Sequence, residues 1–580
     1  MPVGTASPRD TGLSDPVQAP RNHPWLQWYD PGVPATVDVP DTALAALLSE
    51  AAIRHPRRPA IRFLGRSLVY RDLDESVNRF ANHLRDLGVR KGDRVALLLP
   101  NCPQMVIAAY GGLRAGAVLV PSSPLAAERE LRQAWDEAGV RVVVCLSAFY
   151  PKVHRIRQDL PPLEHVVVAR IKDYFPPLLR LLFTLLREGP EGHRVRLPAD
   201  GHTYPFDRFL AAGSPDDPNV PLAGDDLALL QPTGGTTGTP KLAMLSHHNL
   251  LANALQIRAW FVNLLEPDGS DILLGVIPLF HIYGITTVLN LAVAIGGTML
   301  LQPRVVLRDV LKSIDRERPH FFPGIPTLYL AVNDAPAVSR YDLRSLKAAI
   351  SGAAPLPHEV QIEFERLTGA KLVEGYGLTE ASPVTHCTPV EGRRKIGSIG
   401  LPLPGTDAAV FDPDTGTRTL PPGEIGELAV RGPQVMRGYW RGPDETHDVL
   451  RDGWLFTGDL AEMDDEGFFR IVDRKKDLII SGGLNVYPRE VEEALYEHHK
   501  VHKVAVAGIP DVRWGEAVKA YIVLEEGEMA TTEEMIGHCR DRLARYKVPK
   551  FVEFRADLPE NMLGKVLRRR LREEETCRGH

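Results

Sequence analysis

The sequence has few cysteines, and they are scattered. Only five occur in 580 residues, and no two form a Cys-x-x-Cys pair. Disulfide frameworks and structural zinc sites both need sets of matched cysteines, so this sequence argues against either. Such sparse cysteine usage is typical of the reducing cytoplasm, and we expect a cytoplasmic protein.

An excess of positive charge is also missing. The chain has 68 Lys and Arg against 74 Asp and Glu, which gives a formal net charge of −6. A protein that holds nucleic acid by bulk charge needs the opposite sign. We therefore expect no nucleic-acid partner.

Long hydrophobic runs are rare. Residues 275–302 form the one long uncharged stretch, but Pro278, His281, Asn290 and a Gly-Gly pair interrupt it. A membrane-spanning helix needs roughly 20 predominantly apolar residues. We interpret the stretch as a buried strand and helix of a large core.

The N-terminus lacks the charged start and apolar core of an export signal. It begins instead with a stretch rich in Pro, Gly, Ser and Asp. We predict that residues 1–40 form a disordered arm and that the protein is not secreted.

The short apolar segment Phe175–Leu186 (FPPLLRLLFTLL) leaves two interpretations open. It is too short to span a bilayer. It is either a helix packed on the core or a surface helix that admits an apolar substrate or contacts the membrane peripherally.

The pattern of short runs predicts an α/β protein, α+β overall. Residues 41–395 alternate apolar runs such as VALLL and AVLVP with helical patterns, which predicts a large N-terminal core of parallel-rich α/β layers. Residues 396–473 contain short strands punctuated by Gly and Pro, which predicts a small β-rich subdomain. The charged run DRKKD then precedes residues 474–580, which we predict to be a small, mobile α/β C-terminal domain.

A Gly- and Thr-rich loop, TGGTTGTPK, follows the apolar run Leu227–Gln231. Glycines let backbone N–H groups close around an anion, and hydroxyls and a lysine add donors and charge. The residues of this predicted phosphate cradle are Thr233, Gly234, Gly235, Thr236, Thr237, Gly238 and Lys241. It is not the loop of P-loop NTPases, because Pro240 precedes the lysine and Leu242 follows it. Taken alone, the loop could equally be a flexible turn.

Several motifs follow the loop in order: PLFH (278–281), SGAAP (351–355), EGYGLTE (374–380), GWLFTGD (453–459), the stretch 473–488 and Gly564-Lys565. In this order, over about residues 40–572, the chain resembles the adenylate-forming superfamily of acyl- and aryl-CoA synthetases, peptide-synthetase adenylation domains and beetle luciferases. It is most similar to the medium- and long-chain fatty acyl-CoA synthetases.

The resemblance implies that ATP activates a carboxylate to an acyl-adenylate with release of pyrophosphate, and that a thiol then captures the acyl group. Two anions must meet in the first step, so the site has to supply cations and aligned dipoles rather than a protein nucleophile. The implied cofactors are ATP, Mg²⁺ and coenzyme A.

The resemblance also assigns roles to single residues. Tyr376 stacks on adenine, Glu374 and Gly375 line the base, and Asp459 accepts the ribose hydroxyls. Glu380 binds magnesium, with Thr233 as a second ligand, and oxygen atoms suit that ion. The implied ATP-binding residues are the seven loop residues above together with Gly352, Glu374, Gly375, Tyr376, Thr379, Asp459, Arg474, Lys476 and Lys565. The implied catalytic residues are Lys565, Glu380, Thr379 and His281.

Two faces of the C-terminal domain are implied to serve the two half-reactions. Lys565 stabilises charge during adenylation, and rotation about a hinge at Lys476 then presents Ser481, Gly482 and Gly483 to coenzyme A. His281 would lie between the acyl tunnel and the thiol. We do not assign it as a general base, because a thiol with a pKa near 8.5 needs only modest help.

Two positions depart from the family pattern. Leu242 stands where many relatives have glycine, and Asn561-Met562-Leu563 replaces a more usual hydroxyl-containing approach to the terminal lysine. The first alters loop flexibility and the second removes hydroxyls, but neither deletes a charged role.

The resemblance implies a medium- to long-chain fatty acid as the substrate. Part of residues 276–301, a stretch rich in Ile, Leu, Val and Ala and without charge, is expected to line the acyl tunnel. Burial of each CH₂ contributes about 0.8 kcal/mol. The alternatives are an acyl-AMP ligase that loads a carrier protein, an aryl or short-chain acid ligase, and a degenerate acyl-nucleotide binding protein. The motifs leave chain length and a homodimer open.

Overall fold

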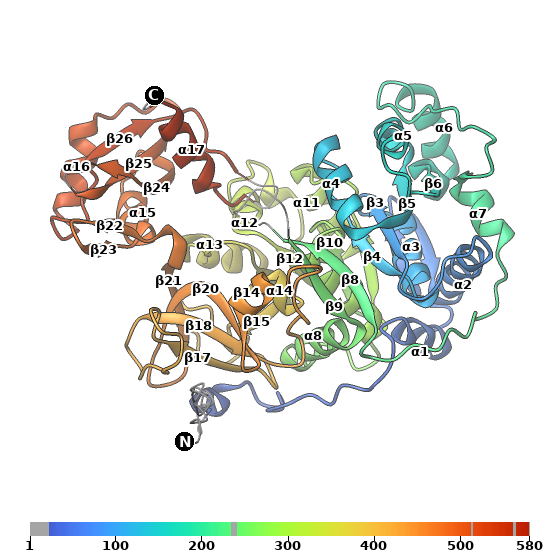
Figure 1. The fold of residues 1–580 in the computed structure, drawn as a ribbon, viewed down its shortest axis with the longest axis horizontal. Coiled ribbons are helices and arrows are strands. Elements are labelled where there is room, and N and C mark those ends of the chain that lie inside the picture. Colours follow the sequence, from blue (N-terminus) through green and yellow to red (C-terminus); the bar gives the residue numbers. More distant parts are fainter. Residues whose placement is uncertain (1–22, 234–240, 512–513, 561–563, 579–580) are drawn as a thin grey trace, which may run out of the picture.

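The computed structural model describes residues 23–233, 241–511, 514–560 and 564–578. Within these residues the strands form four sheets, two large and two small (Figure 1). The two large sheets are mainly parallel, and the expected α/β class is confirmed.

The first sheet carries most of the motifs. The neighbouring strands β14, β13, β12, β10, β11 and β1 run parallel to one another. At the edges of the sheet, β2 pairs with β1, β15 with β14 and β16 with β15, each in the antiparallel direction. The order is β16 (Leu401–Pro402), β15 (Val384–Cys387), β14 (Lys371–Gly377), β13 (Ala348–Ser351), β12 (Phe321–Gly324), β10 (Ile272–Gly275), β11 (Thr298–Leu301), β1 (Pro59–Phe63), β2 (Arg66–Val69). Most of its strands are apolar throughout because parallel sheets are covered on both faces.

The second sheet delivers the chain into the Gly- and Thr-rich loop. It is parallel from β7 to β8, and β9 pairs with β8 in the antiparallel direction. The order is β7 (Thr203–Pro205), β6 (His165–Ala169), β5 (Val140–Leu146), β3 (Arg94–Leu98), β4 (Val118–Pro121), β8 (Leu227–Pro232), β9 (Leu242–Ser246). The loop thus connects two paired strands, and Leu242, at the start of β9, is fully buried.

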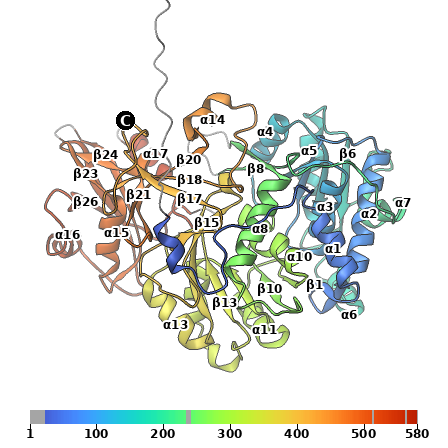
Figure 2. The same cartoon turned by 90° about the horizontal axis from the view of Figure 1, so that it is seen from below.

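Helices cover these sheets and pack with them into three clusters of buried apolar residues (Figure 2). They are α1 (Ala46–Arg54), α2 (Tyr70–Asp86), α3 (Pro103–Arg114), α4 (Glu128–Ala138), α5 (Tyr150–Gln158), α7 (Phe206–Ala212), α8 (His247–Trp260), α11 (Leu307–Glu317), α12 (Pro326–Asn333) and α13 (His358–Thr368). Helix α8 begins at a capping box, in which Ser246 Oγ accepts the Asn249 N–H at 3.2 Å.

Residues 275–302 form buried structure, as the interrupted pattern indicates. They comprise the end of β10, then α9 (Ile282–Gly284), the π-helical turn η4 (Ile285–Asn290), α10 (Leu291–Ile295) and β11. In the described part of the chain, no helix has the length and apolar character needed to cross a membrane.

The third and fourth sheets are small. The third is antiparallel and contains β17 (Asp407–Phe411), β18 (Gly426–Arg431), β19 (Leu450–Arg451), β20 (Trp454–Met463) and β21 (Phe469–Arg474), with α14 (Pro443–Val449) beside it. The fourth contains β22 (Ile479–Ser481), β23 (Leu484–Val486), β24 (Val501–Asp511), β25 (Gly515–Leu524) and β26 (Phe551–Phe554), with α15 (Pro488–Tyr496), α16 (Thr532–Arg540) and α17 (Arg568–Arg578). Figure 1 shows this fourth sheet with its helices as a small domain beside the large one.

The prediction of a disordered arm is wrong for residues 24–30. Trp25, in the short helix η1 (Pro24–Trp28), is 1% exposed and packs edge-on against Phe469. The Asp30 carboxylate accepts backbone N–H groups of Val390 and Gly392 at 2.8 and 2.6 Å. Distant partners therefore order this segment beside the third sheet (Figure 2). Residues 1–22 lie outside the described residues.

The apolar segment after Phe175 forms a surface helix, α6 (Pro177–Leu186). None of its residues is buried, and six leucines are at least 36% exposed: Leu178, Leu179, Leu181, Leu182, Leu185 and Leu186. Phe183 packs against Phe175 at a ring-centroid distance of 5.3 Å, and the Thr184 hydroxyl accepts from Lys172 Nζ at 3.2 Å. The interpretation as a helix packed on the core is therefore wrong.

Candidate active site

The Gly- and Thr-rich loop connects β8 to β9, and these two strands pair with each other in the antiparallel direction. Strand β8 ends at Pro232, and the Thr233 N–H then donates to the Lys241 carbonyl oxygen at 2.8 Å. Thr233 is buried, whereas Lys241 is partly exposed. Five loop positions predicted to bind phosphate lie outside the described residues: Gly234, Gly235, Thr236, Thr237 and Gly238.

Three residues predicted to bind the nucleoside lie together. The Tyr376 hydroxyl donates to Asp459 Oδ2 at 2.6 Å, and Arg474 Nε lies 3.0 Å from Asp459 Oδ1. Asp459 and Arg474 are paired residues of β20 and β21, and Tyr376 comes from β14 of the first sheet. Asp459 is 5% exposed, and its negative charge raises the pKa of Arg474.

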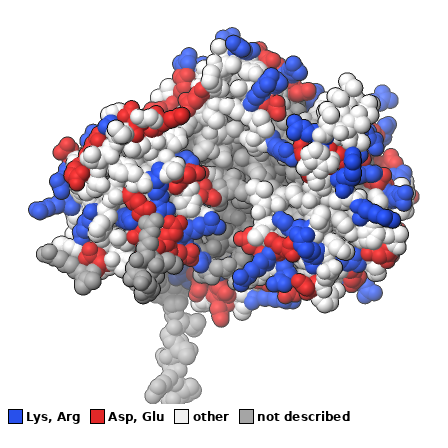
Figure 3. All heavy atoms as spheres, turned by 90° about the horizontal axis from the view of Figure 1, so that it is seen from above, with Lys and Arg blue, Asp and Glu red and all other residues white. Residues whose placement is uncertain are grey.

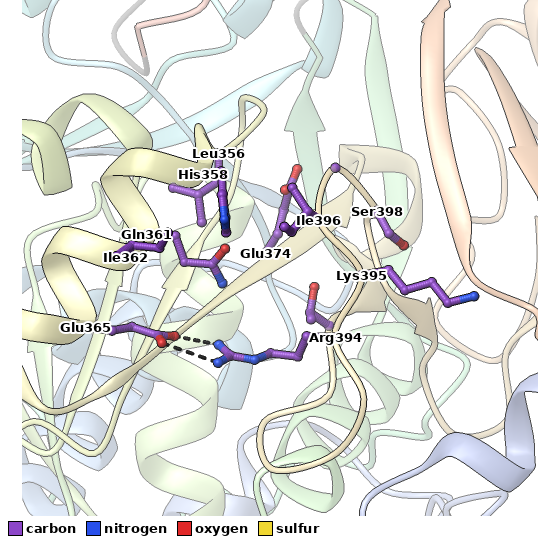
Figure 4. Close-up of a pocket in the computed structure, with 12 residues that line it drawn as sticks. Leu356, His358, Gln361, Ile362, Glu365, Glu374, Arg394, Lys395, Ile396 and Ser398 are labelled. Atoms are coloured by element: carbon purple, nitrogen blue, oxygen red, sulfur yellow. Dashed lines mark hydrogen bonds and ion pairs between the residues drawn. The ribbon is translucent and has the colours of Figure 1, made fainter.

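Glu374 lines a cavity of about 240 Å³ beside this cluster (Figure 4). Burial raises the pKa of its carboxyl to about 7, and the charge of Arg489 opposes the shift. Figure 4 shows Glu374 between helix α13 and the segment 394–398, where Arg394 Nη1 binds Glu365 Oε1 at 2.5 Å.

The SGAAP turn brings backbone close to the same region. Strand β13 ends at Ser351, and a Cβ added at Gly352 would lie 3.2 Å from the Tyr283 ring. Ala353, which follows, has a φ of 70°, a strained value for a residue with a side chain. A Cβ added at Gly375 of β14 would lie nearest to Ile350 of β13, so Gly375 lies beside the strand that Gly352 follows.

Glu380 is held by a residue that sequence analysis missed. The Tyr439 hydroxyl donates to Glu380 Oε1 at 2.7 Å, and Lys241 Nζ lies 4.9 Å from the centroid of the Tyr439 ring. Thr379 begins the short helix η6 (Thr379–Ala381) that carries Glu380. The one available signal for Tyr439 was its place in the run Arg437-Gly-Tyr-Trp440, which is aromatic within a β-rich region.

Lys565 of the small domain faces the nucleoside cluster. Burial and the positive charge of Arg474 lower its pKa to about 8, and Asp459 opposes the shift. Next to it, Gly564 reaches the large domain, because a Cβ added there would lie 3.4 Å from Thr327 Cγ2. Figure 3 shows the hollow between the two domains from above.

The other predicted face of the small domain is remote from this cluster. Ser481, Gly482 and Gly483 lie at the turn between β22 and β23, at the outer edge of the small domain (Figure 1). The Gly482 N–H donates to the Trp514 carbonyl oxygen at 2.8 Å, and both glycines are exposed. The structure therefore brings Lys565, but not this turn, to the nucleoside cluster.

The pKa values of Lys476 and His281 are both lowered, which favours the uncharged form of each side chain. Lys476, in η7 (Lys475–Asp477), has a lowered pKa because it is partly buried near Arg474. Burial lowers the pKa of His281 to about 4, and its Nδ1 accepts the Tyr283 N–H at 3.2 Å as the cap of α9. His281 is therefore uncharged near neutral pH, and its Nδ1 is engaged as the cap of α9.

One cluster elsewhere has the composition of a metal site. Glu266, Asp271 and His320 lie close together, but Lys347 Nζ is 2.7 Å from Glu266 Oε1 and 3.1 Å from Asp271 Oδ1. The lysine ammonium already supplies the positive charge there. We interpret this cluster as a structural ion-pair network.

Comparison with known proteins agrees with this geometry. The model described as AMP-binding enzyme matches residues 48–440, and that of the AMP-binding enzyme C-terminal domain matches residues 490–565. The long-chain-fatty-acid–CoA ligase of Bacillus subtilis (strain 168) is 46% identical over 96% of this chain and 99% of its own length. The ligase of that name from Yersinia pestis is 40% identical over 95% and 98%. ATP-bound MatB from Rhodopseudomonas palustris superposes with a TM-score of 0.80 at 30% identity, covering 91% of this chain and 98% of that one.

Proposed function

Because this chain belongs to the AMP-binding enzyme family, we propose which of its residues perform each step of an AMP-forming acid–CoA ligase. The enzyme activates a fatty acid with ATP and transfers the acyl group to coenzyme A. The observation that carries this function is the 46% identity to a long-chain-fatty-acid–CoA ligase over 96% of the chain.

The nucleoside of ATP is recognised by Tyr376, Asp459 and Arg474. A carboxylate offers about four acceptor sites, so Asp459 can hold its two present donors and still accept ribose hydroxyls. Arg474 orients that carboxylate through the contact of its Nε with Oδ1. The base lies against Tyr376, with Glu374, Gly375 and Gly352 around it.

The carboxylate oxygen of the fatty acid must reach the α-phosphorus against the repulsion of two anions. Lys565 brings a positive charge to the nucleoside cluster from the small domain, and Lys241 brings one to the loop. Thr379 is positioned to donate to the α-phosphate. These groups lower the barrier by stabilising negative charge that grows in the transition state.

The residues present fit a magnesium ion. Glu380 offers a carboxylate whose Oε1 is fixed by the Tyr439 hydroxyl, and Thr233 offers a hydroxyl where the loop begins. Bound magnesium supplies positive charge that neutralises phosphate oxygens and orients them. Glu380 and Thr233 are therefore our proposed ligands.

Transfer to coenzyme A requires a second placement of the small domain. We assign the hinge to Lys476, at the proposed boundary between residues 396–473 and 474–580. Rotation there would withdraw Lys565 and bring Ser481, Gly482 and Gly483 to the acyl-adenylate, where their backbone would border the thiol's path. His281 would lie between that path and the acyl tunnel, which part of the buried stretch 276–301 would line.

Helix α6 is proposed to contact the membrane peripherally. Its exposed leucines lie beside exposed Arg180 and Arg187, a combination that favours an anionic bilayer surface. A fatty acid partitions into such a surface, so an enzyme resting on it meets a concentrated substrate.

The function is tested with purified protein, ATP, magnesium and a panel of carboxylates from C2 to C20. We expect pyrophosphate release with medium- and long-chain acids, and acyl-CoA and AMP when coenzyme A is added. Transfer to a carrier protein but not to coenzyme A would favour an acyl-AMP ligase. Activity confined to aryl or short acids would change the substrate class, and no pyrophosphate with any acid would refute catalysis.

A further inference from the structure

Tyr439 joins the two charged groups proposed to hold the triphosphate. Its hydroxyl donates to Glu380 Oε1 at 2.7 Å, and its ring lies beside Lys241 Nζ at 4.9 Å from the centroid. The latter distance is within the range of a cation–π interaction. Among the residues that the structure describes, no side chain donates to Glu380 Oε2, so the phenol fixes the carboxylate through one oxygen only.

The backbone around Tyr439 ties the loop to Glu380. Residues 437–440 pair with β9 directly after the loop, since the Met244 N–H donates to the Gly438 carbonyl and the Trp440 N–H to that of Leu242, at 2.9 and 2.8 Å. The Met436 N–H donates to the Glu380 carbonyl at 2.8 Å. A single short segment therefore sets the spacing between Lys241 and Glu380.

The phenol is constrained to act as a donor. Tyr439 is 8% exposed, and its hydroxyl oxygen lies 2.7 Å from Glu380 Oε1. Thr446 Oγ1 accepts the Tyr439 N–H at 2.8 Å and fixes the backbone from the other side. Because an ionised carboxylate oxygen can only accept, the hydroxyl proton is directed at the carboxylate.

We propose that Tyr439 is a positioning residue for the magnesium–triphosphate: it orients the Glu380 carboxylate and keeps Lys241 from pairing with it. Opposite charges on the two sides of one tyrosine attract each other in a partly buried site. A direct pair would neutralise both groups before ATP arrives. The face of the aromatic ring instead holds the ammonium. This inference rests on the proposed function.

The test measures ATP binding by calorimetry without fatty acid, so that no turnover occurs, over a series of magnesium concentrations. Tyr439→Phe keeps the ring and removes the hydroxyl. Its half-saturating magnesium concentration should rise roughly tenfold, because a hydrogen bond to a charged group is lost. Its ATP affinity without magnesium should match that of the wild type.

A second variant isolates the ring. Tyr439→Leu should also weaken ATP binding in the absence of magnesium, because Lys241 is then free to pair with Glu380. Adding Glu380→Gln to this variant should restore the magnesium-independent affinity, since no carboxylate remains to bind the lysine. A merely structural role for Tyr439 predicts no such rescue.

Two controls separate this role from damage to the fold. AMP contacts the nucleoside cluster rather than Glu380, so its affinity should be the same in all variants. Tyr29→Phe removes a similar hydrogen bond, to the Pro402 carbonyl at 2.6 Å, and should leave magnesium dependence unchanged. Unchanged magnesium dependence in Tyr439→Phe, or an equal loss of AMP binding, would overturn the proposal. Absence of ATP binding in the wild type would instead refute the proposed function.

Discussion

At the scale of single residues, the lowered pKa of Lys565 makes the first half-reaction depend on pH. Burial and the nearby Arg474 lower this pKa to about 8, so the ammonium is present below pH 8 and lost above it. We expect kcat/KM for pyrophosphate release to fall as the pH rises through about 8. Thioester formation from supplied acyl-adenylate should show no such fall.

Two variants check that the fall of kcat/KM at alkaline pH is due to Lys565. Lys565→Arg keeps the charge at alkaline pH, so kcat/KM should no longer fall as the pH rises through about 8. Lys565→Ala should slow adenylation by roughly 100-fold or more, as for loss of a group that stabilises transition-state charge, and spare thioester formation. An equal loss in both half-reactions would contradict the assignment.

Glu374 should make stability depend on pH. Its carboxyl pKa is raised from the usual value to about 7, so the folded protein retains a proton that the unfolded chain releases above about pH 4.5. Stability is therefore lost as the pH rises from about 4.5 to 7. Glu374→Gln should be more stable than the wild type at pH 8, by about 1–2 kcal/mol, and equal to it near pH 4.5.

Chemical denaturation at the two pH values measures this difference. The matched control is Glu359→Gln, an exposed glutamate of the adjacent helix α13, which should show no pH-dependent effect. A Glu374→Gln protein that is less stable at pH 8 would show that the ionised carboxyl is favoured by the fold.

The local motifs could be predicted because each carries its chemistry within a few residues. Strand pairing across the third sheet then brings Asp459 to Arg474, and strand β14 adds Tyr376. Tyr439 could not be predicted, because its contact with Glu380 spans 59 residues and depends on tertiary structure alone.

At the scale of elements, the turn between β22 and β23 should matter only in the second half-reaction. Gly482 has a φ of 62°, and a Cβ there would lie 2.6 Å from Trp514 Cε3. Gly482→Ala should therefore distort the turn and slow acyl-CoA formation from supplied acyl-adenylate by roughly tenfold or more, while pyrophosphate release without coenzyme A is unchanged.

The control for this turn is Gly527→Ala in the same domain. Gly527 has a φ of 87° but nothing within 4 Å of an added Cβ, so backbone strain is introduced without a clash. Slower adenylation in Gly482→Ala would contradict a role confined to thioester formation.

Helix α6 should govern binding to lipid vesicles. Substituting Leu178, Leu181 and Leu185 with Gln removes apolar side chains worth about 1.5–3 kcal/mol each when buried, so partition onto anionic vesicles should fall at least tenfold. Sedimentation with vesicles measures the bound fraction. The triple variant Ile53→Gln, Leu125→Gln, Met529→Gln removes scattered exposed apolar residues and should bind as the wild type does. Equal binding by the α6 variant would refute the contact.

Element type followed from the sequence where the pattern was repetitive, as in the parallel sheets. Prediction failed where contacts with residues distant in the sequence outweighed the local composition. The Pro- and Gly-rich start predicted disorder, yet Trp25 and Asp30 are fixed by residues more than 300 positions away. The position of α6 on the surface was likewise undecided, because an apolar helix has the same sequence pattern in a core or at a membrane.

At the scale of the whole molecule, the structure shows one placement of the small domain, with Lys565 toward the nucleoside cluster and the β22–β23 turn away from it. The sequence indicated that two faces of the small domain serve the two half-reactions, but it could not indicate which face lies toward the nucleoside cluster in this structure. The central claim is that each placement supports one half-reaction.

Locking the present placement tests this claim most directly. Thr327→Cys with Gly564→Cys places two thiols where an added Cβ lies 3.4 Å from Thr327 Cγ2, close enough for a disulfide, and Cys577→Ser removes a competing thiol. The oxidised protein should form acyl-adenylate and release pyrophosphate but make no acyl-CoA, and reduction should restore the full reaction. Acyl-CoA formation by the oxidised protein at the rate of the reduced one would contradict the account.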